Sequence, residues 1–371
     1  MTIKYLYWND DTGYGIAAKK MMEALIKSGA NIIQVSLIHT ATTHGEYATH
    51  SSRPDTSMYD IVFIHSAPYY IEYLIEPGKF NIAYCTWETT ALPLNYVKVL
   101  NQCDAVFVPS GFNRECFIRS GVFKPILKLP HISEFKGNGK TQKDHGVFIF
   151  YSIGMWTNRK NNFELLDAFA KAFKGEKSIR LILKTSELDY TKPASSFLRK
   201  FRMSRFNKLS SNKKLNQLLK ENQNISVMKQ ELSGNEIKKL HLDGDCYISF
   251  CRSEGWGLGA YEAAWYGKPI LITGFGGQLD YLNDQDSYLL PYTLHQIQES
   301  VWTEYNGHEQ SWAHVNIDKA IETMKYIVDH KSDALKRGQL LQAKMIKEFC
   351  DTVVIQNLLS DIQTILQNKF F

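Results

Sequence analysis

The sequence predicts an α/β protein built from two doubly wound domains that face each other across a cleft. The chain has 371 residues, which is too long for one ordinary hydrophobic core. Short apolar runs alternate with helical patterns along most of the chain, and this alternation is typical of parallel sheets covered on both faces. A polar stretch at residues 135–146, FKGNGKTQKDHG, separates two such series and is predicted to be a linker. We therefore expect one domain at residues 1–140 and a second at residues 141–346.

The first series begins with the apolar run IKYLYW at residues 3–8, followed by the turn NDDTGYG and a helix near residues 16–28. Gly29 follows this helix as a suitable C-terminal cap. Residues 39–57, HTATTHGEYATHSSRPDTS, are polar and predict a loop. Further strands are predicted at residues 31–38, 60–65, 80–85 and 104–109, and further helices at residues 94–102 and 113–120.

The second series repeats the alternation of strands and helices. A basic helix is predicted near residues 195–222, and after Asp318 the sequence is mostly helical to its end. Strands are predicted at residues 147–153, 179–184, 225–228, 246–250 and 269–272, and helices at residues 162–173, 235–242 and 258–267.

Composition and cysteine spacing indicate a soluble globular protein of the cytoplasm. Hydrophobic residues make up 44% of the chain and charged residues 22%. No apolar stretch reaches the roughly 18 residues that a membrane span needs. The first residues, MTIKYLYWNDD, lack the pattern of a signal peptide. The cysteines show no metal-ligand spacing and are predicted to be buried, reduced thiols: Cys85, Cys103, Cys116, Cys246, Cys251 and Cys350.

Positive charge is concentrated in one block of the second series. The net charge is only +5, but the block from Arg199 to Lys214, RKFRMSRFNKLSSNKK, has seven basic residues and no acidic one. Such a block suits anionic lipid headgroups or an anionic substrate, so peripheral contact with the inner face of a membrane is one interpretation. The alternative is a solvated insertion. Nucleic-acid binding is not expected. If the block did bind nucleic acid, the only sign would be an affinity that depends on salt and not on base sequence.

The stretch SEGWGLGAYEAAWYGKP, residues 253–269, combines glycines and two glutamates between two predicted strands. A strand, a glycine turn and a helix direct free backbone N–H groups at one point, which favours an anion. Glu254 lies in the loop, where its carboxylate suits sugar hydroxyls. Glu262 lies in the helix and suits the hydroxyls of a ribose. The alternative interpretation of Glu262 is a residue on the helix surface. The residues that follow it, Ala263, Ala264 and Trp265, nevertheless indicate a tightly packed helix.

Cations and further glycines follow other predicted strands. Arg159 and Lys160 lie in SIGMWTNRKN, just before a helix, and adjacent cations there suit a diphosphate. Lys184 ends the next strand and is expected to point into the same space. Gly13 and Gly15 lie between the first strand and its helix. They lack the full GxGxxG pattern, so a tight turn and a ligand contact are equally good interpretations.

The segment DCYISFCRSEGWGLGAYEAAWYGKPILITGFGGQLDYL, residues 245–282, resembles the retaining glycosyltransferases of the large family that includes sucrose synthases and bacterial mannosyltransferases. The shared mark, Glu followed by seven residues and a second Glu, is matched by Glu254 and Glu262. The resemblance, to group 1 or family 4-like enzymes, covers most of the chain and implies the GT-B fold. It also implies a C-terminal helix, residues 347–371, that crosses back to the first domain.

The resemblance implies a role for each matching residue. Arg159 and Lys160 would bind the donor diphosphate, and Glu262 would bind the nucleotide ribose. Glu254 would hold hydroxyls of the transferred sugar, beside the backbone N–H groups of Gly255, Trp256, Gly257 and Leu258. Gly13 and Gly15 would approach the donor phosphate from the first domain.

The sequence departs from the family pattern at two places. Many relatives carry an arginine where this chain has Met155, and Lys184 is a candidate to supply the missing charge. Relatives also often place a histidine near the donor sugar, where this chain has Trp87 and Glu88 in CTWETT. These two residues are therefore predicted in the neighbourhood of the sugar or acceptor. The alternatives to them are His65 and His131, each more often structural than catalytic.

The resemblance predicts transfer of a sugar from a UDP- or GDP-sugar to a hydroxyl of a glycan or lipid-linked acceptor, with retention of configuration, in the synthesis of surface polysaccharide. Residues 39–57 are the predicted acceptor loop. No cofactor and no metal are expected, because Asp243-Gly244-Asp245 precedes a strand and is interpreted as a turn. One alternative is a non-catalytic relative that binds a sugar nucleotide and supports a partner transferase. A nicotinamide-dependent oxidoreductase would need the glycine pattern that the first strand lacks.

Overall fold

The computed structural model describes residues 1–10, 12–42, 45–50, 58–133, 146–193, 206–307 and 309–369. The chain forms two compact units, one of Met1–Glu134 with Ile346–Phe371 and the other of Phe135–Met345. Sequence analysis placed the corresponding divisions after residues 140 and 346. Apart from its last residue, Gly146, the predicted linker at residues 135–146 lies outside the described residues.

The first unit is organised around a seven-stranded sheet with the order β3-β2-β1-β4-β5-β6-β7. All neighbouring strands are parallel except β2 and β3, which are antiparallel. The chain reverses its direction across the sheet between β1 and β4, which is the point where ligands of such sheets bind. The strands are β1 Thr2–Trp8, β2 Asn31–Thr42, β3 Gly45–His50, β4 Ile61–His65, β5 Phe80–Tyr84, β6 Ala105–Val108 and β7 Ile126–Lys128.

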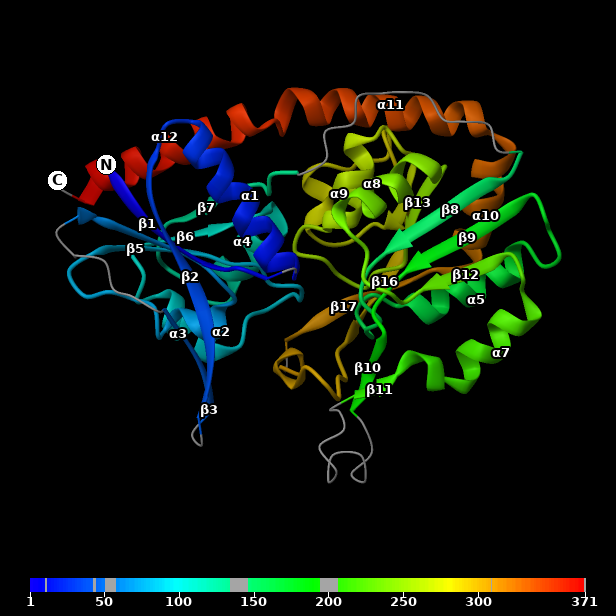
Figure 1. Cartoon of the computed structure of the whole chain (residues 1–371), viewed down its shortest axis with the longest axis horizontal. Helices are drawn as coiled ribbons and strands as arrows, with labels where there is room; N and C mark the ends of the chain where they lie inside the picture. Colours follow the sequence, from blue (N-terminus) through cyan, green and yellow to red (C-terminus); the bar gives the residue numbers. More distant parts are fainter. Residues whose placement is uncertain are drawn as a thin grey trace. The chain divides into compact units, whose positions relative to one another are not determined.

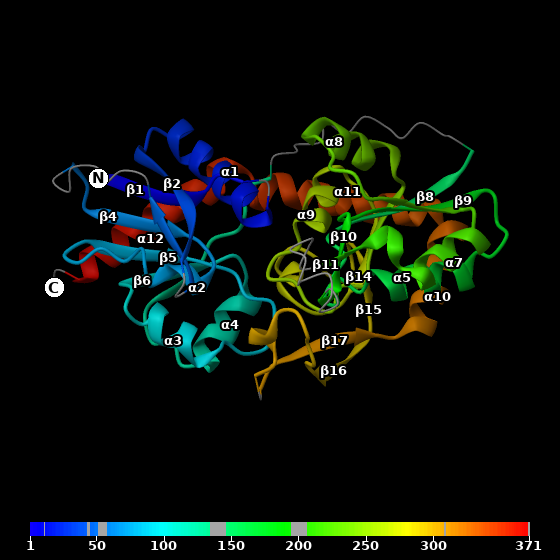
Figure 2. The same ribbon diagram turned by 60° about the horizontal axis from the view of Figure 1, so that its bottom comes forward.

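Helices cover both faces of this sheet. Helix α1 (Gly13–Lys27) and the C-terminal helix α12 (Asp351–Lys369) lie on one face (Figure 1). The opposite face carries the short helices α2 (Pro68–Ile71), α3 (Leu94–Leu100) and α4 (Gly111–Arg119) (Figure 2). Coverage of both faces explains why β4 is buried at every position and reads as a continuous apolar run.

The predicted loop at residues 39–57 is corrected in part by the structure. Strand β2 continues to Thr42 and pairs with β3, so that residues 39–42 and 45–50 form an antiparallel hairpin. Threonine and tyrosine favour extended backbone even in a polar stretch, and an edge hairpin does not require the apolar pattern of a buried strand. Residues 43–44 and 51–57 lie outside the described residues.

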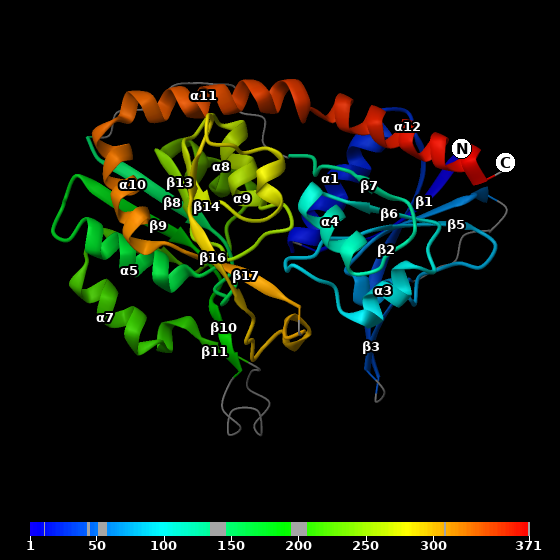
Figure 3. The same ribbon diagram turned by 180° about the vertical axis from the view of Figure 1, so that it is seen from behind.

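The second unit contains a six-stranded, wholly parallel sheet with the order β12-β9-β8-β13-β14-β15. Helices α5, α7 and α10 lie on one face and α8, α9 and α11 on the other (Figure 3). The strands are β8 Phe148–Ile153, β9 Ile179–Lys184, β12 Ile225–Met228, β13 Cys246–Ser249, β14 Ile270–Thr273 and β15 Tyr288–Leu290. The helices are α5 Asn162–Ala172, α7 Lys213–Glu221, α8 Gly234–Asp243, α9 Leu258–Trp265, α10 Ile317–Asp329 and α11 Lys331–Glu348.

Two antiparallel hairpins, which sequence analysis missed, extend from this unit. They pair β10 (Leu188–Pro193) with β11 (Phe206–Lys208) and β16 (Tyr292–Gln296) with β17 (Ser311–Val315). Short single turns of 3-10 helix occur at η2 Leu209–Ser211, η3 Gly277–Asp280 and η4 Thr303–Tyr305.

The predicted basic helix near residues 195–222 is wrong over its described first part. Residues 206–211 form β11 and a 3-10 turn, and α7 begins only at Lys213. Asn212 caps this helix by accepting a hydrogen bond from the backbone N–H of Leu215, and such a cap starts a helix rather than continuing one. Residues 194–205, and with them the first part of the basic block, lie outside the described residues.

The doubly wound α/β architecture and the helical end of the chain are confirmed. All six cysteines are free thiols, five of them buried and Cys350 partly exposed. Within the residues that the structure describes, none of the helices combines the length and the apolarity that a membrane crossing requires.

Helix α12 belongs to the hydrophobic core of the first unit, and this can be tested at Leu358. The Leu358 side chain is fully buried in the core cluster that also contains Val354 and Met21. We expect Leu358→Ala to lower the free energy of unfolding by about 2–5 kcal/mol, because it leaves a cavity. The neighbouring exposed change Asn357→Ala should alter it by less than about 0.5 kcal/mol. Equal effects in urea denaturation would contradict the placement of α12.

Candidate functional site

The predicted diphosphate and sugar residues meet where two neighbouring strands of the second unit end. Strand β8 is followed by residues 154–161, which lead into α5, and the adjacent β13 is followed by residues 250–257, which lead into α9. The backbone N–H of Arg252 donates to the carbonyl oxygen of Arg159 at 2.7 Å, which joins the two loops. Carboxyl ends of parallel strands are the usual place for ligands in such sheets.

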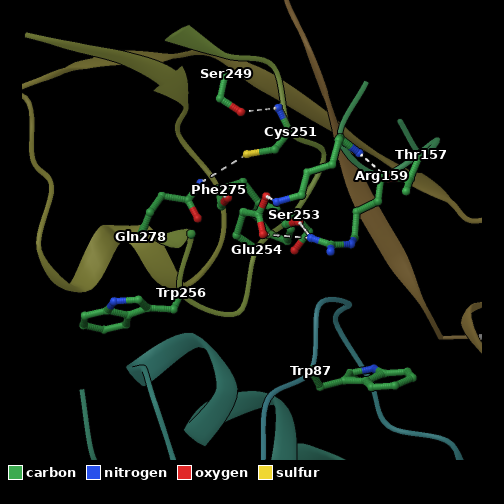
Figure 4. Close-up of polar contacts among 12 residues, drawn as sticks. Trp87, Thr157, Arg159, Ser249, Cys251, Ser253, Glu254, Trp256, Phe275 and Gln278 are labelled. Atoms are coloured by element: carbon green, nitrogen blue, oxygen red, sulfur yellow. Dashed lines mark hydrogen bonds and ion pairs between the residues drawn. The ribbon is translucent and has the colours of Figure 1, made fainter. Parts of the chain in front are cut away.

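The Glu254 carboxylate lies between Arg159 and Lys160. One Arg159 nitrogen, Nη1, donates to Glu254 Oε2 at 2.9 Å and to the carbonyl oxygen of Ser253 at 2.8 Å (Figure 4). The Lys160 ammonium donates to the other carboxylate oxygen, Oε1, at 2.5 Å. Burial alone would raise the pKa of Glu254, but the two cations outweigh it and lower that pKa below its usual value. The structure therefore brings these three predicted residues together as one ion cluster, with Glu254 only 7% exposed.

Two residues that sequence analysis missed shape the Arg159–Lys160 loop. Asn161 is the one described non-glycine residue with a positive φ, at 55°, and its side chain donates to Glu164. Arg252 donates to the Asn161 side-chain oxygen at 3.4 Å and lies over the ring of Trp312. Asparagine tolerates this left-handed conformation better than most residues. An asparagine directly before the predicted helix was therefore the feature of the sequence that could have indicated this turn.

Glycines hold the backbone around Glu254. Gly257 has φ 85° and precedes α9, and Gly276 has φ 114°. A side chain on Gly276 would place its Cβ 2.8 Å from the carbonyl oxygen of Glu254, and the N–H of Gly277 donates to that same oxygen at 2.7 Å. The glycines therefore permit a close approach between the two loops.

The loop after Glu254 offers backbone groups rather than side chains. The Trp256 side chain is only 2% exposed and packs against Tyr281, so its indole does not serve as an open ligand surface. The first hydrogen bond of α9 runs from the N–H of Tyr261 to the carbonyl oxygen of Gly257. The N–H groups of the preceding positions, Leu258 to Ala260, thus have no partner within the helix and carry its positive end.

Glu262 is not the helix-surface residue of the alternative interpretation. Its side chain is 13% exposed, and Oε2 lies 3.3 Å from Nε2 of the fully buried His241 on α8. His241 Nδ1 in turn lies 2.9 Å from the hydroxyl of Tyr151 on β8. Sequence analysis missed His241, because a single histidine in a helix gives no signal until its partner is known.

Lys184 and Met155 do not join the cluster. The Lys184 ammonium donates to the adjacent carbonyl oxygen of Thr185 at 3.0 Å. Burial lowers the pKa of Lys184, and Glu231 partly opposes this. No contact described for Lys184 links its ammonium to Arg159 or Glu254. The side chain of Met155 is 46% exposed.

The two glycines of the first unit lie inside helix α1, not in a turn before it. Gly13 is the first helical residue, and the Thr12 side chain caps the helix by accepting from the N–H of Gly15. A side chain on Gly15 would overlap the backbone and carboxylate of Asp10. This close approach explains Gly15 without a ligand.

Trp87 is a buried structural residue. It is 5% exposed, and its indole N–H donates to Thr89 and to the carbonyl oxygen of Ala91. Its neighbour Glu88 is partly exposed and raises the pKa of Tyr14, after burial, which is the larger cause.

His65 and His131 are packed in a tyrosine cluster of the first unit. The hydroxyl of Tyr5 lies 2.7 Å from His65 Nδ1, and the hydroxyl of Tyr84 lies 2.9 Å from His131 Nδ1. Burial lowers the pKa of His131 to about 3. Burial, and then the neighbouring His131, lower the pKa of His65 well below its usual value. Both imidazoles are therefore neutral at neutral pH.

Comparison with known proteins shows a match to one family over part of the chain and a likeness in fold over most of it. Residues 135–299 match the sequence model of the family described as glycosyl transferases, group 1. No curated protein sequence matches the chain.

Three solved structures show the extent of the fold likeness. Sucrose-phosphate synthase of Thermosynechococcus elongatus has a TM-score of 0.69 at 12% identity, covering 99% of this chain and 100% of that one. HepE of Anabaena, in complex with UDP-glucose, has a TM-score of 0.64 at 11% identity, covering 98% and 100%. TarM of S. aureus has a TM-score of 0.58 at 12% identity and covers 81% of this chain. This chain spans about half of TarM, 54% of its length. These likenesses confirm the GT-B fold.

The buried neutral histidines predict acid sensitivity of the first unit. A histidine in the unfolded chain binds a proton below about pH 6.5, whereas His131 in the folded protein, with its pKa of about 3, stays unprotonated down to about pH 3. The unfolded state therefore binds more protons in this window, and the free energy of unfolding falls as the pH drops through it. We expect His131→Phe to make the fall shallower by up to about 1.4 kcal/mol per pH unit. Tyr84 retains the carbonyl oxygen of Leu129 as a partner. Urea denaturation at several pH values measures the slope, and an unchanged slope would refute the assignment.

Proposed function

We propose that this chain, whose residues 135–299 match the model of the group 1 glycosyl transferases, is a retaining glycosyltransferase that uses a UDP- or GDP-sugar. The observation that carries the proposal is the cluster of Arg159, Lys160 and Glu254 beside the N-terminus of α9. It unites two cations for a diphosphate, a carboxylate for sugar hydroxyls and the positive end of a helix in one place.

In the proposed complex each group has one task. Arg159, Lys160 and the first N–H groups of α9 bind the donor diphosphate. Glu254 accepts hydrogen bonds from the transferred sugar, and Glu262 accepts them from the ribose. Two carboxylates near a diphosphate would repel it, but Glu254 is matched by two cations, and Glu262 has a hydrogen-bond partner in His241. This pairing supports the assignment.

The proposed reaction breaks the bond between the anomeric carbon and the terminal phosphate oxygen and forms a bond from that carbon to the acceptor oxygen on the same face. Negative charge develops on the leaving diphosphate, and positioned cations and helix N–H groups lower the barrier by stabilising it. An oxygen of the leaving diphosphate takes the proton of the acceptor hydroxyl. The reaction then needs no protein base, and we propose that it needs no metal ion.

Structural neighbours favour uridine as the donor base within this proposal. HepE has been solved with UDP and with UDP-glucose, and TarM and the pneumococcal transferase GtfA with UDP. The acceptor is proposed to be a glycan or a lipid-linked glycan of a surface polysaccharide. This rests on family analogy and on the basic block from Arg199 to Lys214, whose described part pairs Lys208 with Glu187 at the surface.

The alternative is a sugar-nucleotide-binding relative without activity that supports a partner transferase. The assembled cluster of Arg159, Lys160 and Glu254 favours the enzyme, because it places two cations where charge would develop on the leaving diphosphate. Donor hydrolysis distinguishes the two.

A screen of UDP, GDP and their sugars tests the donor site. We expect one nucleotide to raise the melting temperature and its sugar to be hydrolysed slowly, with and without EDTA. Lys160→Ala should strongly reduce the melting shift, whereas Lys171→Ala, on the exposed side of α5, should retain it. Binding without hydrolysis would favour the non-catalytic alternative. The donor-site proposal fails if no nucleotide shifts the melting temperature.

Glu254→Gln should separate binding of the diphosphate from transfer of the sugar. The Glu254 carboxylate is ion-paired with both Arg159 and Lys160. The diphosphate of UDP therefore has to displace part of this pairing when it binds. We expect the Kd of Glu254→Gln for UDP to fall by about threefold to tenfold, while donor hydrolysis is lost. Glu322→Gln, an exposed change on α10, is the control and should alter neither quantity. A weaker affinity for UDP in Glu254→Gln would show that Glu254 supports the phosphate site instead of competing for it.

A further inference from the structure

Glu262 is the outer end of a chain of buried polar contacts that crosses three elements of the second unit. The Tyr151 hydroxyl on β8 lies 2.9 Å from Nδ1 of His241 on α8, and Nε2 of His241 lies 3.3 Å from Oε2 of Glu262 on α9. Tyr151 and His241 are fully buried, and Glu262 is 13% exposed. The chain therefore runs from the protein interior to a carboxylate that solvent can reach.

The direction of the hydrogen bonds follows from the chemistry of the two ends. The Glu262 carboxylate can only accept, so Nε2 of His241 is the donor toward it and Nδ1 is left to accept. Burial, as the largest cause, raises the pKa of Tyr151 well above its usual value, so its hydroxyl retains the proton that it donates to Nδ1. A neutral imidazole that accepts at Nδ1 carries its proton on Nε2. His241 therefore donates to Glu262 Oε2, which holds that oxygen in place.

Packing leaves this chain little freedom. A side chain on Gly244 would overlap the ring of Tyr151, so the tyrosine fills a hollow that only glycine leaves open. The His241 ring stacks on Tyr266 with centroids 5.3 Å apart and planes at 9°, and it meets the edge of Tyr151 at 5.4 Å. His241 is thus held on both sides.

The second oxygen of Glu262 is left for a ligand. Among the hydrogen bonds described for the residues of this unit, His241 is the partner of Oε2, and none involves Oε1. A carboxylate with one oxygen held presents the other in a defined direction and loses less conformational freedom when a ligand binds.

We infer that His241 is a positioning residue that fixes Glu262 so that its second oxygen accepts the ribose 2′-hydroxyl, which makes the site selective for ribonucleotides over 2′-deoxyribonucleotides. The inference rests on the proposed function, in which Glu262 binds the ribose of the donor. It adds a partner for Glu262 and a specificity that the family resemblance does not supply.

The test compares the Kd of one ribonucleotide, UDP or GDP according to which binds more tightly, with the Kd of its 2′-deoxy form. Wild type should prefer the ribonucleotide by about tenfold or more, because a hydrogen bond to a carboxylate is lost. His241→Phe keeps the stacked ring and removes the donor, and we expect its preference to fall below about threefold. His241→Gln supplies an amide donor and should restore most of the preference.

Two further variants separate positioning from folding. Tyr151→Phe keeps the ring in its hollow and removes only the hydroxyl that sets the His241 tautomer, so it should lower the preference partly. Lys160→Ala should weaken the binding of the ribonucleotide and of its 2′-deoxy form alike, so the ratio of their Kd values should stay unchanged. If His241→Phe fails to fold, the ratios of His241→Gln and Tyr151→Phe decide the question.

The outcomes distinguish this inference from the proposed function. If wild type binds a ribonucleotide and the His241 and Tyr151 variants weaken both forms equally, His241 is merely structural and the inference is overturned. A wild-type ratio near one overturns it as well, while the donor site stands. If wild type binds neither UDP nor GDP, the proposed function fails and the inference fails with it.

Discussion

The ion cluster of Glu254 with Arg159 and Lys160 is the contact on which the site of the second unit depends. It joins the loops that follow two adjacent parallel strands, β8 and β13, and it is reinforced by the backbone bond from Arg252 to Arg159. Because the carboxylate is nearly buried, the two cations must compensate its desolvation, and they do so well enough to lower its pKa. The same loop then leads directly into α9, so the cluster also determines where the positive end of that helix points.

The second glutamate also has a partner, but of another kind. Glu262 stands two turns further along the chain and is paired with His241 rather than with a lysine or an arginine. A histidine donor is a weaker and more directional partner than a cation, because its ring has a single N–H toward the carboxylate. Glu254, in the loop before α9, and Glu262, within α9, therefore differ in charge environment, which agrees with the different roles proposed for them.

A tyrosine that meets the Nδ1 atom of a buried histidine occurs in both units. Tyr5 and Tyr84 hold His65 and His131 in the first unit, and Tyr151 holds His241 in the second. In the first unit the two imidazoles lie beside each other in an apolar setting, where burial disfavours their charged form. His241 has the Glu262 carboxylate as its other partner. The same local arrangement thus serves packing in one unit and a candidate ligand site in the other.

The sequence by itself determined the doubly wound architecture, most strand positions and the residues of the Glu254 cluster, because apolar periodicity and the Glu-x7-Glu segment are local signals. Tertiary structure alone decided which polar residues act together. It paired Glu262 with His241, brought Arg252 to Asn161, left Lys184 outside the cluster and buried Trp87. It also turned residues 39–42 and 45–50 into an edge hairpin. Such contacts join positions far apart in the chain, so they arise only when strands and helices pack.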